Sequence, residues 1–445
     1  MFVISSEISY YDAMEHVHFI GIGGIGVSAL ARYYLSTRAA VSGSDLTASE
    51  ITTALSGKGA HIIIGNHSPM NLLPETAQVI YTAATAKTNP EIREARRRKI
   101  PTLSYAEAVG DLTRRYRAVT VSGAHGKSTT TALVGLVLEE GYFDPTVIVG
   151  TKIKEYDNSN FRAGKGSHLV LEADEWNRSF LNYSPQIAVV TNIDAEHLDT
   201  YKTVDAVEAA FSEYLAKVPA DGAIVANRDD ERTRRVAKKF GKKVAWYSLK
   251  DRAAYDTRRI LKIPGEHNVS NALAALTAGR VLGVRESDIL KALSRFTGAW
   301  RRFEFKGLLN GGFVFSDYGH HPREITATLA AARQRFPLRR VVCVYQPHQY
   351  QRLQYLWDDF LGAFDLADRV VLLPVYDVTG RETKKAKQAV SSEKLAEALA
   401  ERGKDVRHIE TFDETKDHLR SAVRPGDTVL LMGAGDIYDL TSQLI

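Results

Sequence analysis

The sequence predicts an α/β protein with three domains built on largely parallel sheets. Short runs rich in β-branched residues alternate with amphipathic segments over almost the whole chain, a rhythm typical of parallel sheets covered by helices. Two of these runs end in a glycine-rich turn that opens a helix. We expect strands at residues 17–20, 40–44, 61–65, 78–83, 118–122, 168–173, 187–191, 341–345, 370–373 and 428–432.

Three blocks follow one another along the chain, which at 445 residues is too long for a single ordinary core. Blocks 1–107 and 108–299 each open with a strand, a glycine-rich turn and a helix. Block 300–445 begins with a hairpin around Asn310 and Gly311 and continues with strand–helix units. We therefore expect three domains with these boundaries.

Composition and charge limit the class of protein. A hydrophobic fraction of 44% with 25% charged residues indicates a globular protein and excludes a disordered or fibrous one. The net charge is +5, but the basic run 96–99 closes a helix that begins at Pro90, where cations complement the helix dipole. We therefore expect no nucleic-acid partner.

The lone cysteine, Cys343, excludes disulfides and cysteine-based metal sites within a monomer and favours a reducing compartment. The start of the chain shows no signal-peptide pattern, and no run approaches the ~18 apolar residues of a membrane span. We expect a cytoplasmic protein without membrane insertion.

The first glycine-rich turn has the pattern of a diphosphate-binding loop. It follows a strand, opens a helix, and is followed after 19 residues by an acidic side chain at the end of the next strand. Glycines let the backbone approach a pyrophosphate, and the helix N-terminus supplies N–H groups. The candidate binding residues are Gly21, Gly23, Gly24, Ile25, Gly26 and Asp45. The loop suits NAD and a UDP diphosphate equally well.

The second glycine-rich turn predicts a triphosphate site. Backbone N–H groups would surround the β- and γ-phosphates, Lys127 would neutralise them, and the Ser128 hydroxyl would reach Mg²⁺. The loop is two residues shorter than the usual P-loop, but it lies between an apolar strand and a helix. Its candidate residues are Gly123, Ala124, His125, Gly126, Lys127, Ser128 and Thr129. Because a dehydrogenase has no use for a triphosphate, the two loops together indicate a nucleotide-carried substrate activated by ATP.

Eleven ordered motifs resemble those of the Mur ligases over nearly the full length. They are HVHFIGIGGIG (16–26), SGSD (42–45), KTNPE (87–91), SGAHGKSTTT (122–131), LEADE (171–175), TNIDAEHLDTY (191–201), GEHNVSNALAA (265–275), WRRFE (300–304), DYGHHPREI (317–325), QPHQYQR (346–352) and GAGDI (433–437). The resemblance implies a Rossmann-like UDP-binding domain, a central P-loop ATPase domain and a mobile, Rossmann-like C-terminal domain.

Within the family, the chain resembles the members that join L-alanine to the lactyl carboxylate of UDP-N-acetylmuramate in wall synthesis. This resemblance implies ATP and Mg²⁺ as cofactors, an acyl-phosphate intermediate, and a monomer or weak homodimer. It places metal ligands at Ser128, Glu172 and His197. A carboxylate and an imidazole at neighbouring strand ends suit such a shared cation.

The resemblance also assigns the remaining site residues. It places Asn268 and Asn271 at the ATP adenine, although Asn268 equally fits a helix N-cap. It places Arg302 at the γ-phosphate and Asp317 at the ATP ribose, both reaching the nucleotide from another domain as the enzyme closes. His348 and Arg352 would bind the amino acid. The catalytic residues are then Lys127, Glu172, His197 and Arg302.

One residue departs from the alanine-adding pattern. Gln349 stands in QPHQYQR where those ligases usually carry arginine, so one expected charge for the amino-acid carboxylate is missing. The acceptor could therefore be L-alanine, glycine, serine or a preformed peptide, the last as in a related ligase of wall recycling. An NAD-dependent dehydrogenase and a non-enzymatic nucleotide-binding module are disfavoured by the second loop and by the completeness of the site.

Overall fold

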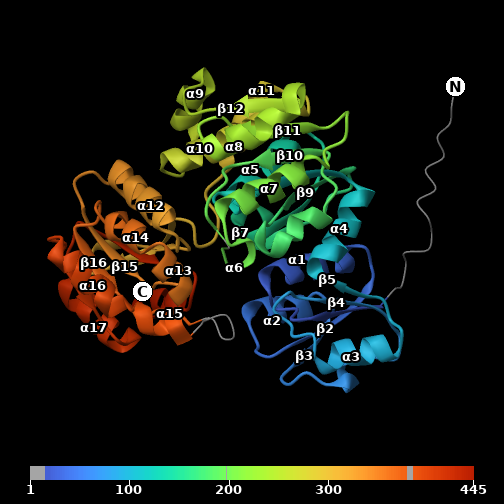
Figure 1. The fold of residues 1–445 in the computed structure, drawn as a ribbon, viewed down its shortest axis with the longest axis horizontal. Helices are drawn as coiled ribbons and strands as arrows, with labels where there is room; N and C mark the ends of the chain where they lie inside the picture. Colours follow the sequence, from blue (N-terminus) through green and yellow to red (C-terminus); the bar gives the residue numbers. More distant parts are fainter. Residues whose placement is uncertain (1–15, 197, 378–383) are drawn as a thin grey trace. The chain divides into compact units, whose positions relative to one another are not determined.

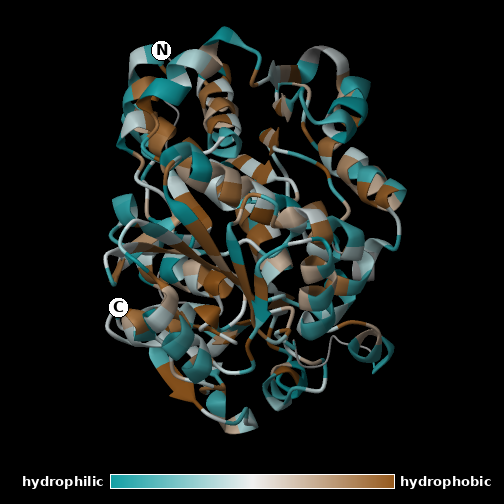
Figure 2. Ribbon diagram, turned by 90° about the vertical axis from the view of Figure 1, so that its left-hand side faces the viewer, coloured by the Kyte–Doolittle hydropathy of each residue, from teal (hydrophilic) through white to brown (hydrophobic). Residues whose placement is uncertain are grey.

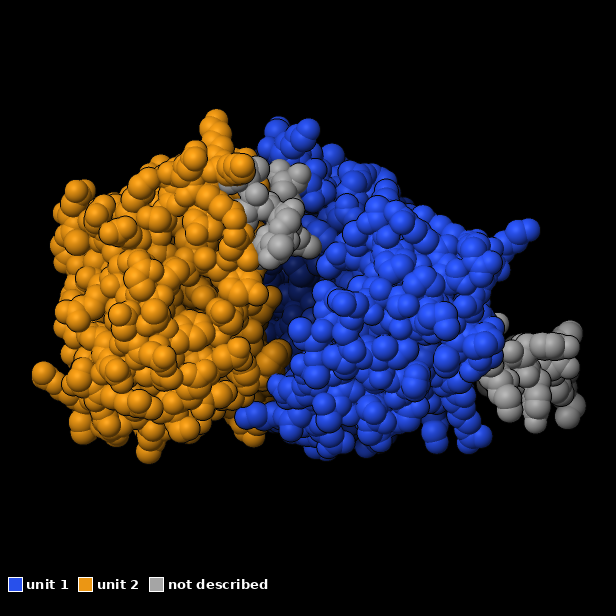
Figure 3. Space-filling view, turned by 90° about the horizontal axis from the view of Figure 1, so that it is seen from below, with its two compact units in different colours: residues 1–260, 270–296 blue, residues 261–269, 297–445 orange. Residues whose placement is uncertain are grey.

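A computed structural model describes residues 16–196, 198–377 and 384–445 and confirms a three-domain α/β architecture with three sheets (Figure 1). The chain forms two compact units, one of residues 1–260 and 270–296 and one of residues 261–269 and 297–445 (Figure 3). The first two sheets belong to unit 1 and the third belongs to unit 2. No helix in the described residues is long and apolar enough to cross a bilayer.

The first sheet is parallel throughout, in the order β3-β2-β1-β4-β5. Its strands are β1 (His16–Ile20), β2 (Ala40–Asp45), β3 (His61–Ile64), β4 (Thr76–Tyr81) and β5 (Thr102–Ser104). Its helices are α1 (Ile25–Ser36), α2 (Glu50–Ser56), α3 (Pro90–Arg97) and α4 (Tyr105–Arg115). The chain order reverses beside β1, and ligands of such sheets bind outside the strand ends at this switch point. The first glycine loop leaves β1 at that point.

The second sheet has the order β12-β11-β10-β6-β9-β7-β8, and only the β7–β8 pair is antiparallel. Its strands are β6 (Arg117–Ser122), β7 (Thr146–Ile153), β8 (Ser159–Arg162), β9 (His168–Glu172), β10 (Ile187–Val190), β11 (Ala223–Asn227) and β12 (Val244–Tyr247). Its main helices are α5 (Lys127–Glu140), α7 (Val204–Leu215), α8 (Glu231–Ala237), α9 (Arg252–Ile260), α10 (Glu266–Val281) and α11 (Glu286–Arg295). Helix α5, which follows the second glycine loop, is buried on all sides from residue 129 to 138.

Hydrophobic side chains of the first two sheets pack into one continuous core, which includes Phe19 of β1 and Leu169 of β9. Figure 2 shows strands with hydrophobic (brown) stretches in the interior, while the surrounding helices alternate hydrophobic and hydrophilic (teal) turns. A buried amide adds a specific link. Asn160 of β8 donates hydrogen bonds to the backbone oxygen of Ile25 at 2.5 Å and to Oγ of Ser28 at 2.9 Å. The helix that follows the first glycine loop is therefore fixed to the second sheet.

The third sheet has the order β13-β14-β18-β15-β16-β17 and begins with the predicted hairpin. Asn310 and Gly311 both have positive φ, 49° and 79°, which matches the type I′ turn that suits strand twist. The strands are β13 (Glu304–Leu309), β14 (Gly312–Asp317), β15 (Arg340–Tyr345), β16 (Arg369–Leu372), β17 (Val406–His408) and β18 (Asp427–Met432). The helices are α12 (Pro322–Arg335), α13 (Tyr350–Tyr355), α14 (Trp357–Ala363), α15 (Lys384–Ala389), α16 (Ser392–Glu401), α17 (Phe412–Ala422) and α18 (Ile437–Leu444).

The predicted strands appear within two residues of their expected bounds. The domain boundaries stay predictions; the one after Glu107 falls inside α4. Block 108–299 also carries β7, β8, β11 and β12, which the sequence did not single out.

Glu91, the glutamate of the KTNPE motif, is the centre of a buried hydrogen-bond network that includes residues of β1 and β2. Glu91 is fully buried and lies 3.1 Å from Nε2 of His18. Ser44 donates to the same carboxylate at 2.7 Å and Asn71 at 2.6 Å, while Nδ1 of His67 lies 3.0 Å away. Burial alone would raise the pKa of Glu91, but these hydrogen bonds together outweigh it and hold the pKa at about 2.

We predict that Glu91→Gln lowers the free energy of unfolding at pH 7 by about 3 kcal/mol, because the network loses its buried charge. The folded pKa lies below the ordinary 4.5, so this stabilisation is present above pH 4.5 and is lost as the pH falls toward 2. Urea unfolding followed by circular dichroism should therefore show the difference from wild type shrinking between pH 5 and pH 2.5. An equal difference at both pH values would contradict the account. The exposed Glu75→Gln serves as the control.

Candidate active site

The first glycine loop is held against the end of β2. Backbone N–H groups of Gly21 and Ile22 donate to the oxygen of Ser44 at 2.8 and 3.1 Å. The N–H of Gly23 donates to Oδ2 of Asp45 at 2.8 Å, and a Cβ at Gly23 would lie 2.8 Å from that oxygen. The structure thus brings the predicted acidic residue onto the loop. A glycine, Gly24, is the N-cap of α1, so no side chain caps the N–H groups of its first turn.

The second glycine loop joins β6 to α5 in a conformation that requires glycine. Gly123 has φ +133°, and a Cβ there would lie 2.1 Å from Oγ1 of Thr191. Gly126 has φ +82° and is the N-cap of α5. A Cβ at Gly126 would lie 2.3 Å from Oδ1 of Asn271. Asn271, predicted to lie at the adenine, is therefore directly against the second glycine loop.

Lys127 is the cation of this loop. Its Nζ donates to the backbone oxygen of Gly123 at 2.7 Å and lies 3.2 Å from the carboxylate of Glu175 and 4.0 Å from that of Asp174. Burial would lower the pKa of Lys127, but the charges of Glu175, Asp174 and Glu172 raise it above its ordinary value. The side chain is therefore an ammonium ion held at the start of α5.

Glu172 ends β9, the parallel neighbour of β6, and its carboxylate accepts hydrogen bonds from Ser128 and from the backbone N–H of Gly150. Burial raises the pKa of Glu172, and these hydrogen bonds together with Lys127 offset it only in part. A cation beside the carboxylate would stabilise its charged form. Hydroxyl and carboxylate oxygens are ligands that suit Mg²⁺. The predicted third ligand, His197, lies outside the described residues.

Two predicted ATP residues of unit 2 meet at the end of β14. Asp317 accepts hydrogen bonds from the backbone N–H groups of Phe303 and Gly319, both at 2.8 Å. Burial raises the pKa of Asp317, and Arg302 lowers it in part. Arg302 in turn lies 3.3 Å from Glu324. Its pKa is raised because Glu324 and Asp317 outweigh its burial.

Asn268 is in the first turn of α10, which begins at Glu266, and its Nδ2 donates to the oxygen of Pro264 at 2.6 Å. The structure thus places it inside the helix, so the N-cap interpretation is wrong. The sequence alone could not decide this, because an asparagine that leads into an alanine-rich helix fits the N-cap equally well.

The predicted amino-acid residues also come together within unit 2. His348 stacks on Tyr376 with ring centroids 5.4 Å apart, and Nη1 of Arg352 donates to the oxygen of His348 at 3.1 Å. Between them, Gln349 has φ 74°, which L-residues rarely adopt. Its backbone N–H donates to the oxygen of Tyr376 at 3.2 Å. Strained backbone of this kind is concentrated at ligand sites.

Two residues around the second glycine loop, Asn192 and Glu175, were not among the predicted site residues. Asn192 accepts from the backbone N–H of His125 through Oδ1 at 2.9 Å, and its backbone oxygen accepts from Ala124 at 3.2 Å. Glu175 is buried and pairs with Lys127. Their positions inside TNIDAEHLDTY and LEADE were the available signal.

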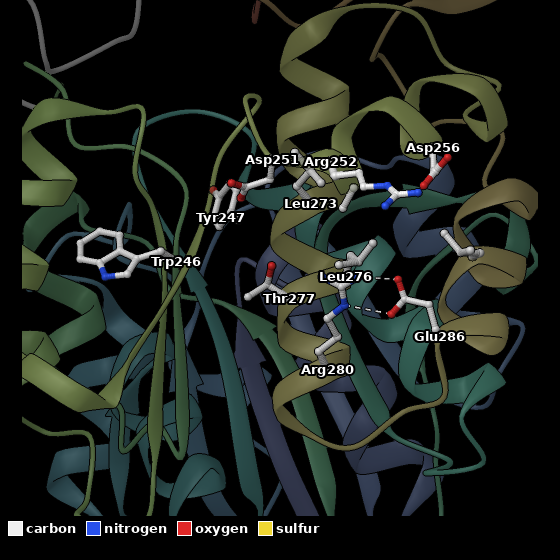
Figure 4. Close-up of a pocket in the computed structure, with 12 residues that line it drawn as sticks. Trp246, Tyr247, Asp251, Arg252, Asp256, Leu273, Leu276, Thr277, Arg280 and Glu286 are labelled. Carbon is white, nitrogen blue, oxygen red and sulfur yellow. Dashed lines mark hydrogen bonds and ion pairs between the residues drawn. The ribbon is translucent and has the colours of Figure 1, made fainter.

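A cavity of about 450 Å³ lies apart from these residues, walled by β12, α9, α10 and α11 (Figure 4). Arg280 and Glu286 form an ion pair in its wall, with Nε and Oε2 2.9 Å apart. The helical repeat of 3.6 residues puts the α10 residues of this wall, Leu276 and Arg280 among them, on the side opposite Asn271. The cavity contains none of the predicted site residues.

Three family models match the chain in succession: "Mur ligase family, catalytic domain" over residues 16–117, "Mur ligase middle domain" over 121–279, and "Mur ligase, glutamate ligase domain" over 301–435. The UDP-N-acetylmuramate–L-alanine ligase of Clostridium botulinum is 37% identical over 457 aligned residues, which cover 98% of each chain. The chain belongs to the Mur ligase family.

Solved Mur ligase structures agree with this membership. The UDP-N-acetylmuramate-alanine ligase of Thermotoga maritima superposes with a TM-score of 0.80 at 29% identity, covering 96% of this chain and 98% of that one. A murein peptide ligase from Psychrobacter arcticus gives 0.70 at 22% identity, covering 97% and 98%, which shows the shared fold alone. The family resemblance predicted from the eleven motifs is confirmed.

Proposed function

We propose that this Mur ligase forms the amide bond between the lactyl carboxylate of UDP-N-acetylmuramate and the amine of L-alanine, with hydrolysis of ATP to ADP and phosphate. The observation that carries the proposal is the pair of glycine loops within unit 1, one shaped for a diphosphate and one carrying a lysine for a triphosphate. The similarity to enzymes named for this reaction supports the choice of substrates.

The first step activates the carboxylate, which by itself is a poor acylating agent. A lactyl oxygen attacks the γ-phosphorus of ATP, the bond from that phosphorus to the bridging oxygen breaks, and ADP leaves. Lys127 neutralises the phosphate oxygens, and Arg302 stabilises the transferred phosphoryl group. Ser128, Glu172 and His197 would hold Mg²⁺, which supplies further charge neutralisation.

The second step forms the amide. The amine of the amino acid attacks the acyl-phosphate carbon, inorganic phosphate leaves, and the nitrogen loses a proton. His348 and Arg352 hold the amino-acid carboxylate, so that the amine is positioned rather than chemically activated. Asn268 and Asn271 bind the adenine and Asp317 the ribose, while residues Gly21–Gly26 and Asp45 bind the UDP end.

A preformed peptide as acceptor is the second candidate. The neutral Gln349 favours it, because an arginine would give a free amino acid two charge-assisted hydrogen bonds.

The single cysteine, Cys343, is buried and forms no disulfide, which supports a place in the reducing cytoplasm. We propose a monomer or weak homodimer there.

We predict that Lys127→Ala lowers alanine-dependent phosphate release by at least ~10²–10³-fold, since an electrostatic contact to the reacting phosphates is lost. UDP-N-acetylmuramate binding, measured by calorimetry on the folded variant, should stay within about twofold, because the two loops bind different nucleotides. Exposed Lys217→Ala is the matched control. Equal loss of UDP-sugar affinity would show that the loops are misassigned.

We also predict that Gln349→Arg lowers the KM for L-alanine by roughly tenfold, which corresponds to ~1.4 kcal/mol, with little change for ATP. The measurement is a titration of L-alanine, glycine, L-serine and a preformed tripeptide at saturating ATP and UDP-sugar. Gln349→Gly provides the control, because it removes the strained φ without adding charge. An unchanged or raised alanine KM in Gln349→Arg would place residue 349 away from the carboxylate and favour the peptide.

A further inference from the structure

Tyr105 is a half-buried tyrosine held at the first position of α4. The N-cap, Ser104, accepts a hydrogen bond from the N–H of Glu107 through its side chain, and the carboxylate of Glu107 accepts one from the backbone N–H of Ser104 at 2.7 Å. This capping box fixes the start of the helix and therefore the position from which the phenol projects. The mechanism above gives this side chain no role.

The phenol lies against the first glycine loop. A Cβ added at Gly26 would be 3.2 Å from Cζ of Tyr105 and 3.3 Å from its oxygen. Both atoms belong to the hydroxyl end of the ring. The tip of the side chain, rather than its base, therefore covers the last glycine of the diphosphate loop.

The phenol is also close enough to two carboxylates near the second loop for their charges to act on it. Burial raises the pKa of Tyr105, and the negative charges of Glu172 and Asp174 raise it further. No residue in the described part of the chain forms a hydrogen bond with its hydroxyl. Tyr105 is therefore a neutral phenol whose hydroxyl has no partner among the described residues, lying against Gly26 and within the influence of the carboxylates Glu172 and Asp174.

This position coincides with a chemical requirement of the substrate. Any nucleotide-linked carboxylate with its diphosphate at the first loop must span to the second loop to be phosphorylated. The spanning part of the proposed substrate is a sugar with a lactyl ether. Aromatic rings pack on the apolar faces of sugars, and a phenol can donate a hydrogen bond to a ring substituent or ether oxygen.

We propose that Tyr105 is a substrate-binding residue that packs against the sugar–lactyl part of the nucleotide substrate and donates a hydrogen bond to it. The proposal rests on the proposed function, because it requires a sugar between the two loops. It deepens that function by naming a residue that recognises the spanning group and neither nucleotide.

The test compares UDP-N-acetylmuramate with UDP, which lacks the spanning group. In Tyr105→Phe, which keeps the ring on Gly26, we expect the Kd for UDP-N-acetylmuramate to rise roughly fivefold to tenfold, as for a lost hydrogen bond. The Kd for UDP and the KM for ATP should stay within about twofold. Tyr105→Leu should weaken UDP-N-acetylmuramate further and still spare UDP. Tyr116→Phe, at the other end of α4, is the matched control and should change neither ligand.

Two outcomes would overturn the proposal. Equal weakening of UDP and UDP-N-acetylmuramate in Tyr105→Phe would mean that the phenol only shapes the glycine loop. Unchanged affinity for both ligands would mean that the hydroxyl makes no contact with substrate. Failure of the proposed function gives a different result, since the wild type itself would then bind UDP-N-acetylmuramate no better than UDP.

Discussion

The proposed reaction depends on holding the two glycine loops at a fixed separation within one compact unit. In the proposed reaction each loop binds one of two nucleotides, and the carboxylate oxygen of one must closely approach the γ-phosphorus of the other for phosphoryl transfer. The shared core and the hydrogen bonds from Asn160 to Ile25 and Ser28 fix the helix of the first loop to the sheet of the second. Because both loops are attached to one core, the bound carboxylate and the bound triphosphate would not have to meet by diffusion.

Charge around the second loop follows from the same constraint. Three carboxylates, Glu172, Asp174 and Glu175, raise the pKa of a single ammonium, that of Lys127. The local excess of negative charge would repel a triphosphate if it were uncompensated. A divalent cation between Glu172 and Ser128 would compensate the excess. Of these acids Glu175 lies nearer to Nζ of Lys127, at 3.2 Å, than Asp174 does, at 4.0 Å.

Much of this arrangement could be predicted from the sequence because its determinants are local. The order strand, glycine turn, helix places both loops, and parallel strand ends bring Glu172 beside Ser128. Contacts between distant segments could not be predicted in this way. The residues next to Gly126 in the sequence do not indicate that Asn271 lies against it. Tyr105 begins a helix whose sequence has an ordinary amphipathic pattern, so its contact with Gly26 could not be predicted either. The positive φ of Gln349 is likewise set by its bond to Tyr376.

The central claim is that the lactyl carboxylate is phosphorylated before the amide forms. It is tested most directly with UDP-N-acetylmuramate carrying ¹⁸O in both carboxylate oxygens, unlabelled ATP and L-alanine. If an acyl phosphate forms, one labelled oxygen leaves with phosphate at each turnover and the other stays in the amide, which mass spectrometry of both products measures. Released phosphate that contains no label from the carboxylate would contradict the account.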